Sequence, residues 1–354
     1  MPGVANLYFC PMWIAIAVLF IFVATFFGIG WWLSSTPFAG PTSDHFDGYQ
    51  FLNQGNARAQ NLSSVVKWIY QRQQGPWEDL TVHPVSVVKP PKKSNPITAI
   101  YYINHSSFLI QLDGKNILTD PVFSKRVSPF SFAGPRRMQN PGIAFENLPH
   151  IDLILLSHNH YDHLDLLTVR RLQTKHDPLF LVPLGVKDFL LRKGISKILE
   201  LDWWNTEHFQ DLSITCTQAQ HFSGRGLFDR DRSLWCGYSI QGREHQVLFI
   251  GDTGFGKFFL DFPDRIGQPD VAIIPIGAYK PEWFMHPIHC SPAQAIDIHT
   301  LIKSKRSIAC HFGTFPLGDD GMKEPPSILR RNLQEKGIPL DSFVILEHGQ
   351  HLQI

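Results

Sequence analysis

The sequence predicts an α/β fold of four layers, αββα, in which two β-sheets pack face to face between outer helices, behind an N-terminal transmembrane helix. Short apolar runs recur from residue 97 to residue 346, and most are four to seven residues long and bounded by Gly, Pro, Asp or Asn. Such runs are typical of buried strands. The early runs follow one another directly, as in hairpins, whereas helical patterns separate several later ones. A long uncharged apolar segment precedes them all and predicts the transmembrane helix.

Residues 1–36 form the predicted membrane anchor. No Asp, Glu, Lys or Arg occurs before Asp44, and residues 12–33 are long enough to cross a hydrocarbon core of about 30 Å as a helix. Trp31 and Trp32 stand at its end, where interfacial aromatic side chains are expected. A cleaved signal peptide is the alternative, but the run exceeds the usual core of ~7–15 residues and no positive charge precedes it. We expect an uncleaved single-pass anchor, and its orientation does not follow from the sequence because one flank has no basic residue.

The rest of the chain divides at residue 97. Residues 37–96 are predicted as a linker and N-terminal extension, with a helix over residues 58–73, and residues 97–354 as one folded domain. The net charge is +1, so no large basic face is expected and nucleic acid is a poor candidate partner. The five cysteines include no CxxC pair and predict buried small side chains rather than disulfides or a zinc knuckle.

Twelve apolar runs are predicted as strands of the domain. They cover residues 97–103, 108–112, 116–119, 151–156, 179–182, 198–201, 212–217, 234–240, 246–250, 271–276, 307–310 and 343–346. Helices are predicted over residues 165–176, 185–193, 291–303 and 326–336. Ser291 followed by Pro292 is typical of an N-cap and first helical position, and Gly337 stands where a helix C-cap is expected.

The densest group of metal-ligating side chains follows the run at residues 151–156. His158, His160, Asp162 and His163 occur within six residues. Residues two apart in an extended segment point to the same side, so His158 and His160 are expected together, with Asp162 and His163 around the turn. Four such ligands can serve two adjacent metal ions, and burying them unpaired would be costly. Imidazole and carboxylate ligands suit zinc, whose catalytic sites keep one position for water.

Three further ligands are predicted because each follows a predicted strand, where functional side chains gather in a layered fold. They are His221, Asp252 in the loop Gly251-Asp252-Thr253-Gly254, and His311. A lone histidine after a strand is seldom a ligand. The combination with His158-x-His160-x-Asp162-His163 is what predicts a two-metal site.

These residues resemble the metallo-β-lactamase superfamily of αββα hydrolases, whose ligand order they follow. The segments LTDPVFSKRVSP, GPRR, LLSHNHYDHLD, FLVPLG, LELDWW, GDTGF, IPIGAYKPEWFM and HFGTF are similar to N-acylphosphatidylethanolamine-hydrolysing phospholipase D and its bacterial relatives. The resemblance covers roughly residues 97–351 and so implies a metallo-β-lactamase-fold hydrolase domain over residues 97–354. The N-terminal 95 residues show no comparable match, and the strong anchor is a departure from the family pattern.

The resemblance implies two Zn²⁺ per chain. One would be held by His158, His160 and His221, the other by Asp162, His163 and His311, with Asp252 bridging them. Asp120 matches a family aspartate near the site, and we expect it to orient a ligand imidazole by a hydrogen bond, with a turn-forming Asp before proline as the alternative. His105 matches a family histidine at the start of the second strand and is expected to support the ligands or to be a purely structural residue.

The resemblance also implies the reaction: a metal-bridging hydroxide hydrolyses N-acylphosphatidylethanolamine to N-acylethanolamine and phosphatidate. Asp162, Asp252 and His289 are the expected catalytic residues, and His289 is placed to meet the substrate head group. Further substrate contacts are predicted for Tyr161, Trp203 and Trp204, although core packing is the favoured alternative for the two tryptophans. The expected partners are the phospholipid substrate and the lipid bilayer, and the relatives suggest a homodimer.

Three other functions compete with this one. The first is a hydrolase of the same fold acting on a lactone, a nucleotide phosphodiester or another phospholipid. The second is a non-catalytic, membrane-tethered binding module, against which the presence of all seven ligands argues. The third is an iron site with redox chemistry, but His163 in place of a second carboxylate favours zinc.

Overall fold

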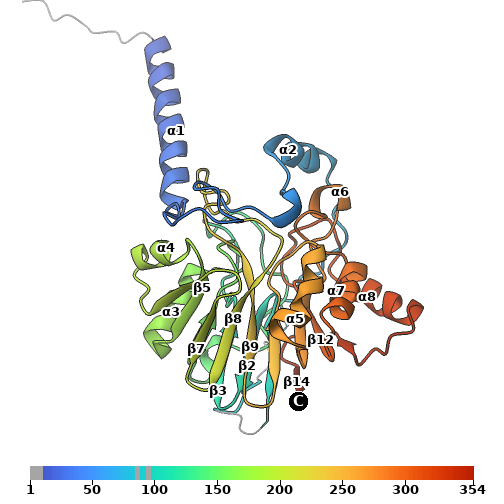
Figure 1. Cartoon of the computed structure of the whole chain (residues 1–354). Coiled ribbons are helices and arrows are strands. Elements are labelled where there is room, and N and C mark those ends of the chain that lie inside the picture. Colours follow the sequence, from blue (N-terminus) through green and yellow to red (C-terminus); the bar gives the residue numbers. More distant parts are fainter. Residues whose placement is uncertain (1–10, 84–87, 93–96) are drawn as a thin grey trace, which may run out of the picture.

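Two seven-stranded sheets stacked face to face form the body of the molecule. The computed structural model describes residues 11–83, 88–92 and 97–354, so the prediction of a buried Cys10 lies outside the described residues. Helices cover the outer face of each sheet, with α3 and α4 on one side and α5, α7 and α8 on the other (Figure 1). The predicted αββα arrangement is confirmed.

The first sheet joins both ends of the domain. Its order is β14 (His351–Gln353), β1 (Ala99–Asn104), β2 (Ser107–Leu112), β3 (Lys115–Thr119), β4 (Leu153–Leu155), β5 (Leu179–Pro183) and β6 (Ile198–Leu201). The order of the second sheet is β13 (Phe343–Val344), β12 (Arg306–Cys310), β11 (Val271–Pro275), β10 (Gln246–Phe249), β9 (Cys236–Gln241), β8 (Leu212–Gln218) and β7 (Thr206–Phe209). In each sheet, antiparallel pairs at one end give way to parallel pairs at the other.

The caps predicted for two of the helices are present in the structure. The longer helices after α1 (Pro11–Leu33) are α2 (Leu62–Gln71), α3 (Leu166–His176), α7 (Pro292–Leu301) and α8 (Glu324–Glu335). Shorter turns are α4 (Lys187–Arg192), α5 (Phe262–Ile266), α6 (Glu282–Met285), η1 (Gln54–Asn56), η2 (Phe145–Asn147) and η3 (Lys257–Asp261). Ser291 forms a capping box with Gln294 at the start of α7, with Pro292 as the first helical residue. Gly337 follows α8 with φ +65°, a conformation that glycine adopts without strain.

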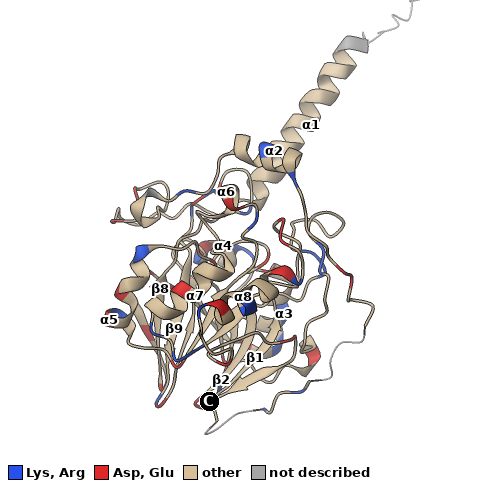
Figure 2. Cartoon of the chain, turned by 90° about the vertical axis from the view of Figure 1, so that its right-hand side faces the viewer, with Lys and Arg blue, Asp and Glu red and all other residues tan. Residues whose placement is uncertain are grey.

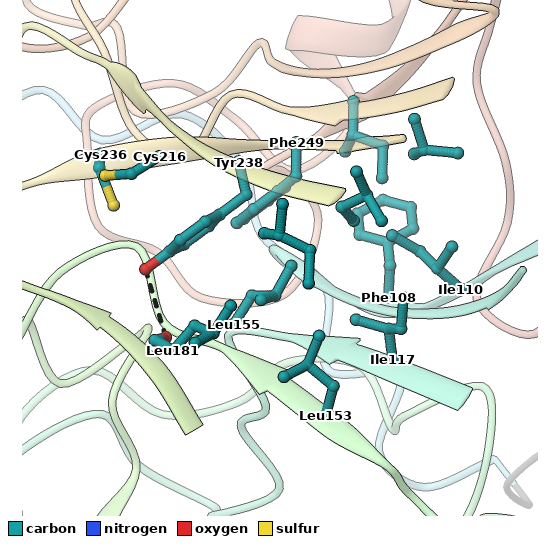
Figure 3. Close-up of a cluster of buried hydrophobic side chains, with 14 of the residues drawn as sticks. Phe108, Ile110, Ile117, Leu153, Leu155, Leu181, Cys216, Cys236, Tyr238 and Phe249 are labelled. Carbon is teal, nitrogen blue, oxygen red and sulfur yellow. Dashed lines mark hydrogen bonds between the residues drawn. The ribbon is translucent and has the colours of Figure 1, made fainter. Parts of the chain in front are cut away.

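The core between the sheets explains why the apolar runs predicted the strands. Tyr238, Phe249, Phe108 and Leu155 are among its buried members (Figure 3). The Tyr238 hydroxyl donates to the carbonyl oxygens of Leu156 and Leu181, at 2.9 and 3.2 Å, and so satisfies its polar atom across the two sheets. Each sheet has one further core, which lies between its outer face and the helices that cover it. Cys216, Cys236, Cys290 and Cys310 are free and buried, as predicted.

Helix α1 (Pro11–Leu33) stands apart from the sheets. It is long and apolar enough to cross a membrane, and almost all its described side chains are exposed. Figure 1 shows it projecting from the end of the molecule where α2 also lies, and Figure 2 shows it free of charged residues. Its foot is joined to the domain, because the Ser35 amide donates to Asp229 at 2.7 Å and Asn159 donates to the Ser35 hydroxyl at 3.1 Å.

The segment predicted as linker and extension packs onto the domain. Phe46 and Phe51 belong to the core between the two sheets. Asn61 caps α2 by accepting from the Ser64 amide, and Trp68 on that helix stacks on Phe284 with ring centroids 4.9 Å apart. The extension therefore forms one wall of the region where the metal-ligating loops meet.

Candidate metal centre

The predicted ligands come from loops that leave strands at one edge of the two-sheet stack. His158 to His163 follow β4, His221 follows β8, Asp252 follows β10 and His311 follows β12. Strands β8, β10 and β12 point in the same direction, because β9 is antiparallel to both β8 and β10, and β10 to β12 are parallel. All seven predicted ligands are brought together in the groups described next.

The first group contains three histidines. Nε2 of His158 lies 2.8 Å from Nδ1 of His160, and Nε2 of His221 lies 3.3 Å from the same atom. The Nδ1–H of His221 donates to the carbonyl oxygen of Ile288 at 2.8 Å, which leaves Nε2 free to bind a metal. These ring atoms lie within 4.8 Å of one another, so one ion can contact all three.

The second group surrounds the Asp162 carboxylate. Its Oδ2 lies 3.3 Å from Nε2 of His163 and 3.5 Å from Nε2 of His311. Nε2 of His105 is also close, at 3.1 Å from the same oxygen. His105 therefore borders the ligand atoms directly and holds Asp162, which agrees with the supporting role expected of it.

Asp252 lies between the two groups. Its Oδ2 is 3.1 Å from Nε2 of His163 and 3.0 Å from Nε2 of His311, both of the second group. The same oxygen is 3.8 Å from Nε2 of His221, of the first group. One carboxylate oxygen thus faces both groups, which is the geometry that a bridging ligand needs.

Asp120 is fully buried behind His163. Its Oδ2 accepts from Nδ1 of His163 at 2.6 Å, and Ser157 donates to both carboxylate oxygens through its amide and hydroxyl. The predicted hydrogen bond to a ligand imidazole is therefore present. It fixes the tautomer of His163 and turns Nε2 toward Asp252.

The histidines of the centre fall into two classes, those with a lowered pKa and those with a raised pKa. Burial, reinforced by neighbouring imidazoles, lowers the pKa of His160 to about 3, and burial lowers the pKa of His221 to about 4 despite Asp252. Burial also acts to lower the pKa of His311, but Asp252 and Asp162 outweigh it and raise the value to about 9. Without a metal, protonated imidazoles thus compensate the two buried carboxylates.

Several buried atoms at the centre have no hydrogen-bond partner among the described residues. They are Nε2 of His163, Oδ1 of Asp252, Nδ1 of His289 and both ring nitrogens of His311. Nε2 of His163 and Nε2 of His311 lie 3.1 and 3.0 Å from Oδ2 of Asp252, but not at the angles of a hydrogen bond. Buried polar atoms are almost always satisfied, so several unpaired atoms in one place indicate a missing ligand. The donor set of imidazole and carboxylate fits zinc and also iron.

The residues predicted to contact the substrate lie in different parts of the structure. His289 lines the centre, with Nδ1 3.9 Å from Oδ2 of Asp252. Tyr161 turns away from it, because its hydroxyl donates to the carbonyl oxygen of Arg225 and its ring lies 3.9 Å beneath that guanidinium. Trp203 and Trp204 lie in core packing, the favoured alternative: Trp203 stacks on His45 at 4.5 Å, and Trp204 packs edge-on against Phe262.

Asn53 is a site residue that the sequence did not reveal. Its Oδ1 accepts from the His221 amide at 3.0 Å and its Nδ2 donates to the His221 carbonyl oxygen at 2.7 Å. It also accepts from the indole of Trp235 at 2.9 Å. No pattern marks this asparagine, because it lies in the extension, far along the chain from the ligand that it holds.

A pocket of about 370 Å³ opens beside His221. Its lining includes Trp235, which is buried, and Phe222 and Asn53, which are half-buried, together with the exposed side chains of Arg230 and Leu62 and with Arg58. Leu62 is the first residue of α2, so the pocket leads from the end of the molecule that carries α1 and α2 to the first group of histidines.

Comparisons with known proteins agree with the fold. A model described as "Beta-lactamase superfamily domain" matches residues 115–312, more than half of the chain. The chain belongs to this superfamily. A Caenorhabditis elegans superfamily relative named N-acyl-phosphatidylethanolamine-hydrolyzing phospholipase D 1 is 36% identical over 262 residues, which are 70% of this chain and 74% of that one.

Other similar proteins match less of their length or share only the fold. A Saccharomyces cerevisiae protein named N-acyl-phosphatidylethanolamine-hydrolyzing phospholipase D, mitochondrial, is 36% identical over 220 residues, 60% of this chain and 47% of that one. A solved structure of a possible metal-dependent hydrolase from Veillonella parvula has a TM-score of 0.60 at 16% identity and covers 73% of this chain and 100% of its own. By family, the chain is a hydrolase of the β-lactamase superfamily.

Proposed function

We propose that the chain is a zinc-dependent phosphodiesterase of phospholipase D type that hydrolyses N-acylphosphatidylethanolamine to N-acylethanolamine and phosphatidate at a membrane. The observation that carries the proposal is the position of Asp252, whose single Oδ2 faces both histidine groups. The names of the relatives supply the substrate class. The apolar helix α1 supports the membrane setting.

The residues divide the work of the site. His158, His160 and His221 would hold one zinc, Asp162, His163 and His311 the other, and Asp252 both. When bound, the zinc ions would supply an activated water at neutral pH and polarise the phosphoryl oxygens. Burial lowers the pKa of His289 well below its usual range, so its imidazole is neutral and serves as a hydrogen-bond donor to the phosphoryl or leaving oxygen.

The pocket beside His221 is the proposed entrance for the lipid. Arg58 and Arg230 supply positive charge to its lining, where a phosphodiester would pass. Leu62, Val66 and Ile69 form an exposed apolar stripe on α2 at the same end of the molecule as α1 (Figure 1). A bilayer covering this end would let the substrate enter without crossing water.

The test combines metal content with product analysis. The full chain in detergent is assayed for zinc and iron by elemental analysis, and its products from N-oleoylphosphatidylethanolamine are followed by mass spectrometry. We expect about two zinc ions per chain and release of N-oleoylethanolamine, both lost in Asp252→Asn and His158→Ala. The controls Asp264→Asn and His208→Ala, at exposed positions away from the site, should keep both.

The outcomes separate the rival functions. Two bound zinc ions with no lipid turnover would exclude the phospholipase and move the search to lactones and other phosphodiesters. Two bound iron ions would favour redox chemistry, and a solved di-iron β-hydroxylase from Streptomyces venezuelae shares the fold with a TM-score of 0.53 at 21% identity. A chain that binds no metal would contradict the site itself.

A further inference from the structure

A second pocket, of about 480 Å³, lies at the foot of α1. Trp32 and Leu33 of α1 form one wall, and the other walls come from α3, α4 and the loop at residues 124–131. No member of the metal-ligating groups is among its lining residues, although Tyr161, between His160 and Asp162, contributes its ring. The pocket therefore lies behind the metal loop and is separate from the pocket beside His221.

Five cations and one carboxylate line this pocket. The cations are Lys125, Arg126, Arg170, Lys193 and Arg225. None of them forms an ion pair with a carboxylate within the described part of the chain. Asp165 is the acid in the lining, but its carboxylate is already occupied: it accepts from the amides of Phe123 and Ser124 and from the Thr168 hydroxyl. These donors are neutral and leave the charge of Asp165 in place, so the lining carries an excess of positive charge, five cations against one carboxylate.

These cations repel one another electrostatically. Lys193 is half-buried, and burial together with the charges of Arg192, Arg170 and Arg225 lowers its pKa. Arg170 and Lys193 are also held near each other, because Nε of Arg170 donates to the Lys193 carbonyl oxygen at 3.0 Å. An anion bound between them would relieve this repulsion.

The position of the pocket at the end of α1 indicates the source of such an anion. Tryptophans at the end of a membrane-spanning helix lie at the level of the lipid head groups. Nζ of Lys193 is 4.7 Å from the centre of the Trp32 ring, so the cations lie at that same level. Phe130 and Leu167, both exposed, add apolar surface to the lining, which suits a glycerol backbone better than a free ion.

We propose that this pocket binds the phosphate of an anionic phospholipid head group as an accessory site, distinct from the metal centre. The inference depends on the membrane anchoring in the proposed function, but it does not depend on the substrate. Basic clusters next to a membrane-spanning helix bind anionic lipids in this way. Contact between Arg225 and the Tyr161 ring would bring the bound lipid against the segment that carries His160 and Asp162.

Native mass spectrometry of the full chain in a neutral detergent tests the site directly. The probes are dioctanoyl phosphatidylglycerol, which is anionic, and dioctanoyl phosphatidylcholine, which is zwitterionic, with inorganic phosphate as competitor. We expect the wild-type chain to bind phosphatidylglycerol in preference to phosphatidylcholine. Each basic residue near an anionic lipid contributes roughly fivefold in affinity, so Lys125→Gln with Lys193→Gln should raise the Kd for phosphatidylglycerol roughly 25-fold.

A matched control removes two lysines elsewhere. Lys257 and Lys303 are exposed and form no ion pair within the described residues, and their double Gln variant should bind phosphatidylglycerol like the wild type. Arg170→Gln serves as a second test variant, with folding checked by the thermal midpoint. Equal binding by test and control variants, or equal binding of both lipids, would overturn the proposal.

Two further outcomes keep the proposals apart. Displacement of the lipid by inorganic phosphate at equal concentration would assign the pocket to a soluble phosphate and overturn the lipid. Selective phosphatidylglycerol binding in a chain that does not hydrolyse N-oleoylphosphatidylethanolamine would support this site and contradict the substrate assignment alone. Hydrolysis of N-oleoylphosphatidylethanolamine without selective phosphatidylglycerol binding would support the substrate assignment and contradict this site.

Discussion

At the scale of single residues, the ligand cluster was predictable because it is local, whereas the support that Asn53 gives it was not. His158, His160, Asp162 and His163 are close in sequence, so their spacing alone indicated a metal site. Asn53 reaches His221 from the extension by two hydrogen bonds that follow only from the folded chain. The orientation of Tyr161 away from the ligands likewise depends on Arg225, which no spacing rule connects to it.

Asp120→Asn should weaken metal binding by about 10- to 100-fold, as is usual when the partner of a ligand imidazole is changed. The amide cannot accept from Nδ1 of His163 and from Ser157 as strongly as the carboxylate does. Competition with a chelator measures the affinity. Asp113→Asn is the control, because Asp113 also has a positive φ but lies in the hairpin turn between β2 and β3 and is not one of the metal-ligating residues. Equal affinities in the two variants would refute this role.

His45 is expected to make stability depend on pH. Burial acts to lower its pKa, but hydrogen bonds from its ring to Asp202 and Asp44 raise it above the ordinary value. A raised pKa means that this contribution is complete below about pH 6.5 and is lost as the pH rises through the folded-state value. The thermal midpoint of the wild type should therefore exceed that of His45→Phe by more at pH 5.5 than at pH 8.5. A constant difference would contradict the prediction.

At the scale of elements, strands buried on both faces were easiest to predict. Strands β1, β2, β10 and β11 are buried along their whole length and appear in the sequence as mainly apolar runs. Strand β7 was missed because its residues alternate between exposed and half-buried. Strand β14 was missed because only Leu352 of its three residues is buried, and its pairing with β1 joins distant parts of the chain.

The apolar stripe of α2 is expected to act on membranes. Val66→Gln with Ile69→Gln should lower turnover of bilayer-embedded substrate roughly tenfold, because burial of such side chains contributes about 1.5–3 kcal/mol each when complete. Gln is a good helix former, so the helix itself should persist. Turnover of a short-chain substrate dissolved in detergent should be unchanged, and Val66→Leu with Ile69→Leu is the matched control. Equal losses on both substrates would indicate damage to the site instead.

At the scale of the whole molecule, the four layers followed from the order of hairpin and helix-linked strands. What the sequence could not supply was the placement of the extension, whose Phe46 and Phe51 fill the core between the sheets. No sequence pattern distinguishes these two phenylalanines from exposed loop residues, because the surface that buries them exists only in the folded domain. The position of α1 against the loop at Asn159 depends on the same tertiary packing.

Removing the metal should loosen the whole domain, because the ligands come from both sheets. Chelation leaves Asp162 and Asp252 compensated only by protonated imidazoles, and it removes a tie between β4 and β8, β10 and β12. We expect a lower thermal midpoint after treatment with a chelator, restored by zinc. Metal should also leave as the pH falls, because ligand imidazoles must be neutral. An unchanged midpoint after complete metal loss would count against the site.

The foot of α1 sets where a water-soluble form of the protein can begin. Ser35 is hydrogen-bonded both to Asp229 and to Asn159, and Asn159 stands between His158 and His160. Cutting at residue 97 would strip away Ser35 together with Asn53 and the two core phenylalanines. A soluble version for crystallisation or inhibitor screening should therefore start at Ser34, immediately after the last apolar turn, and keep every residue that follows.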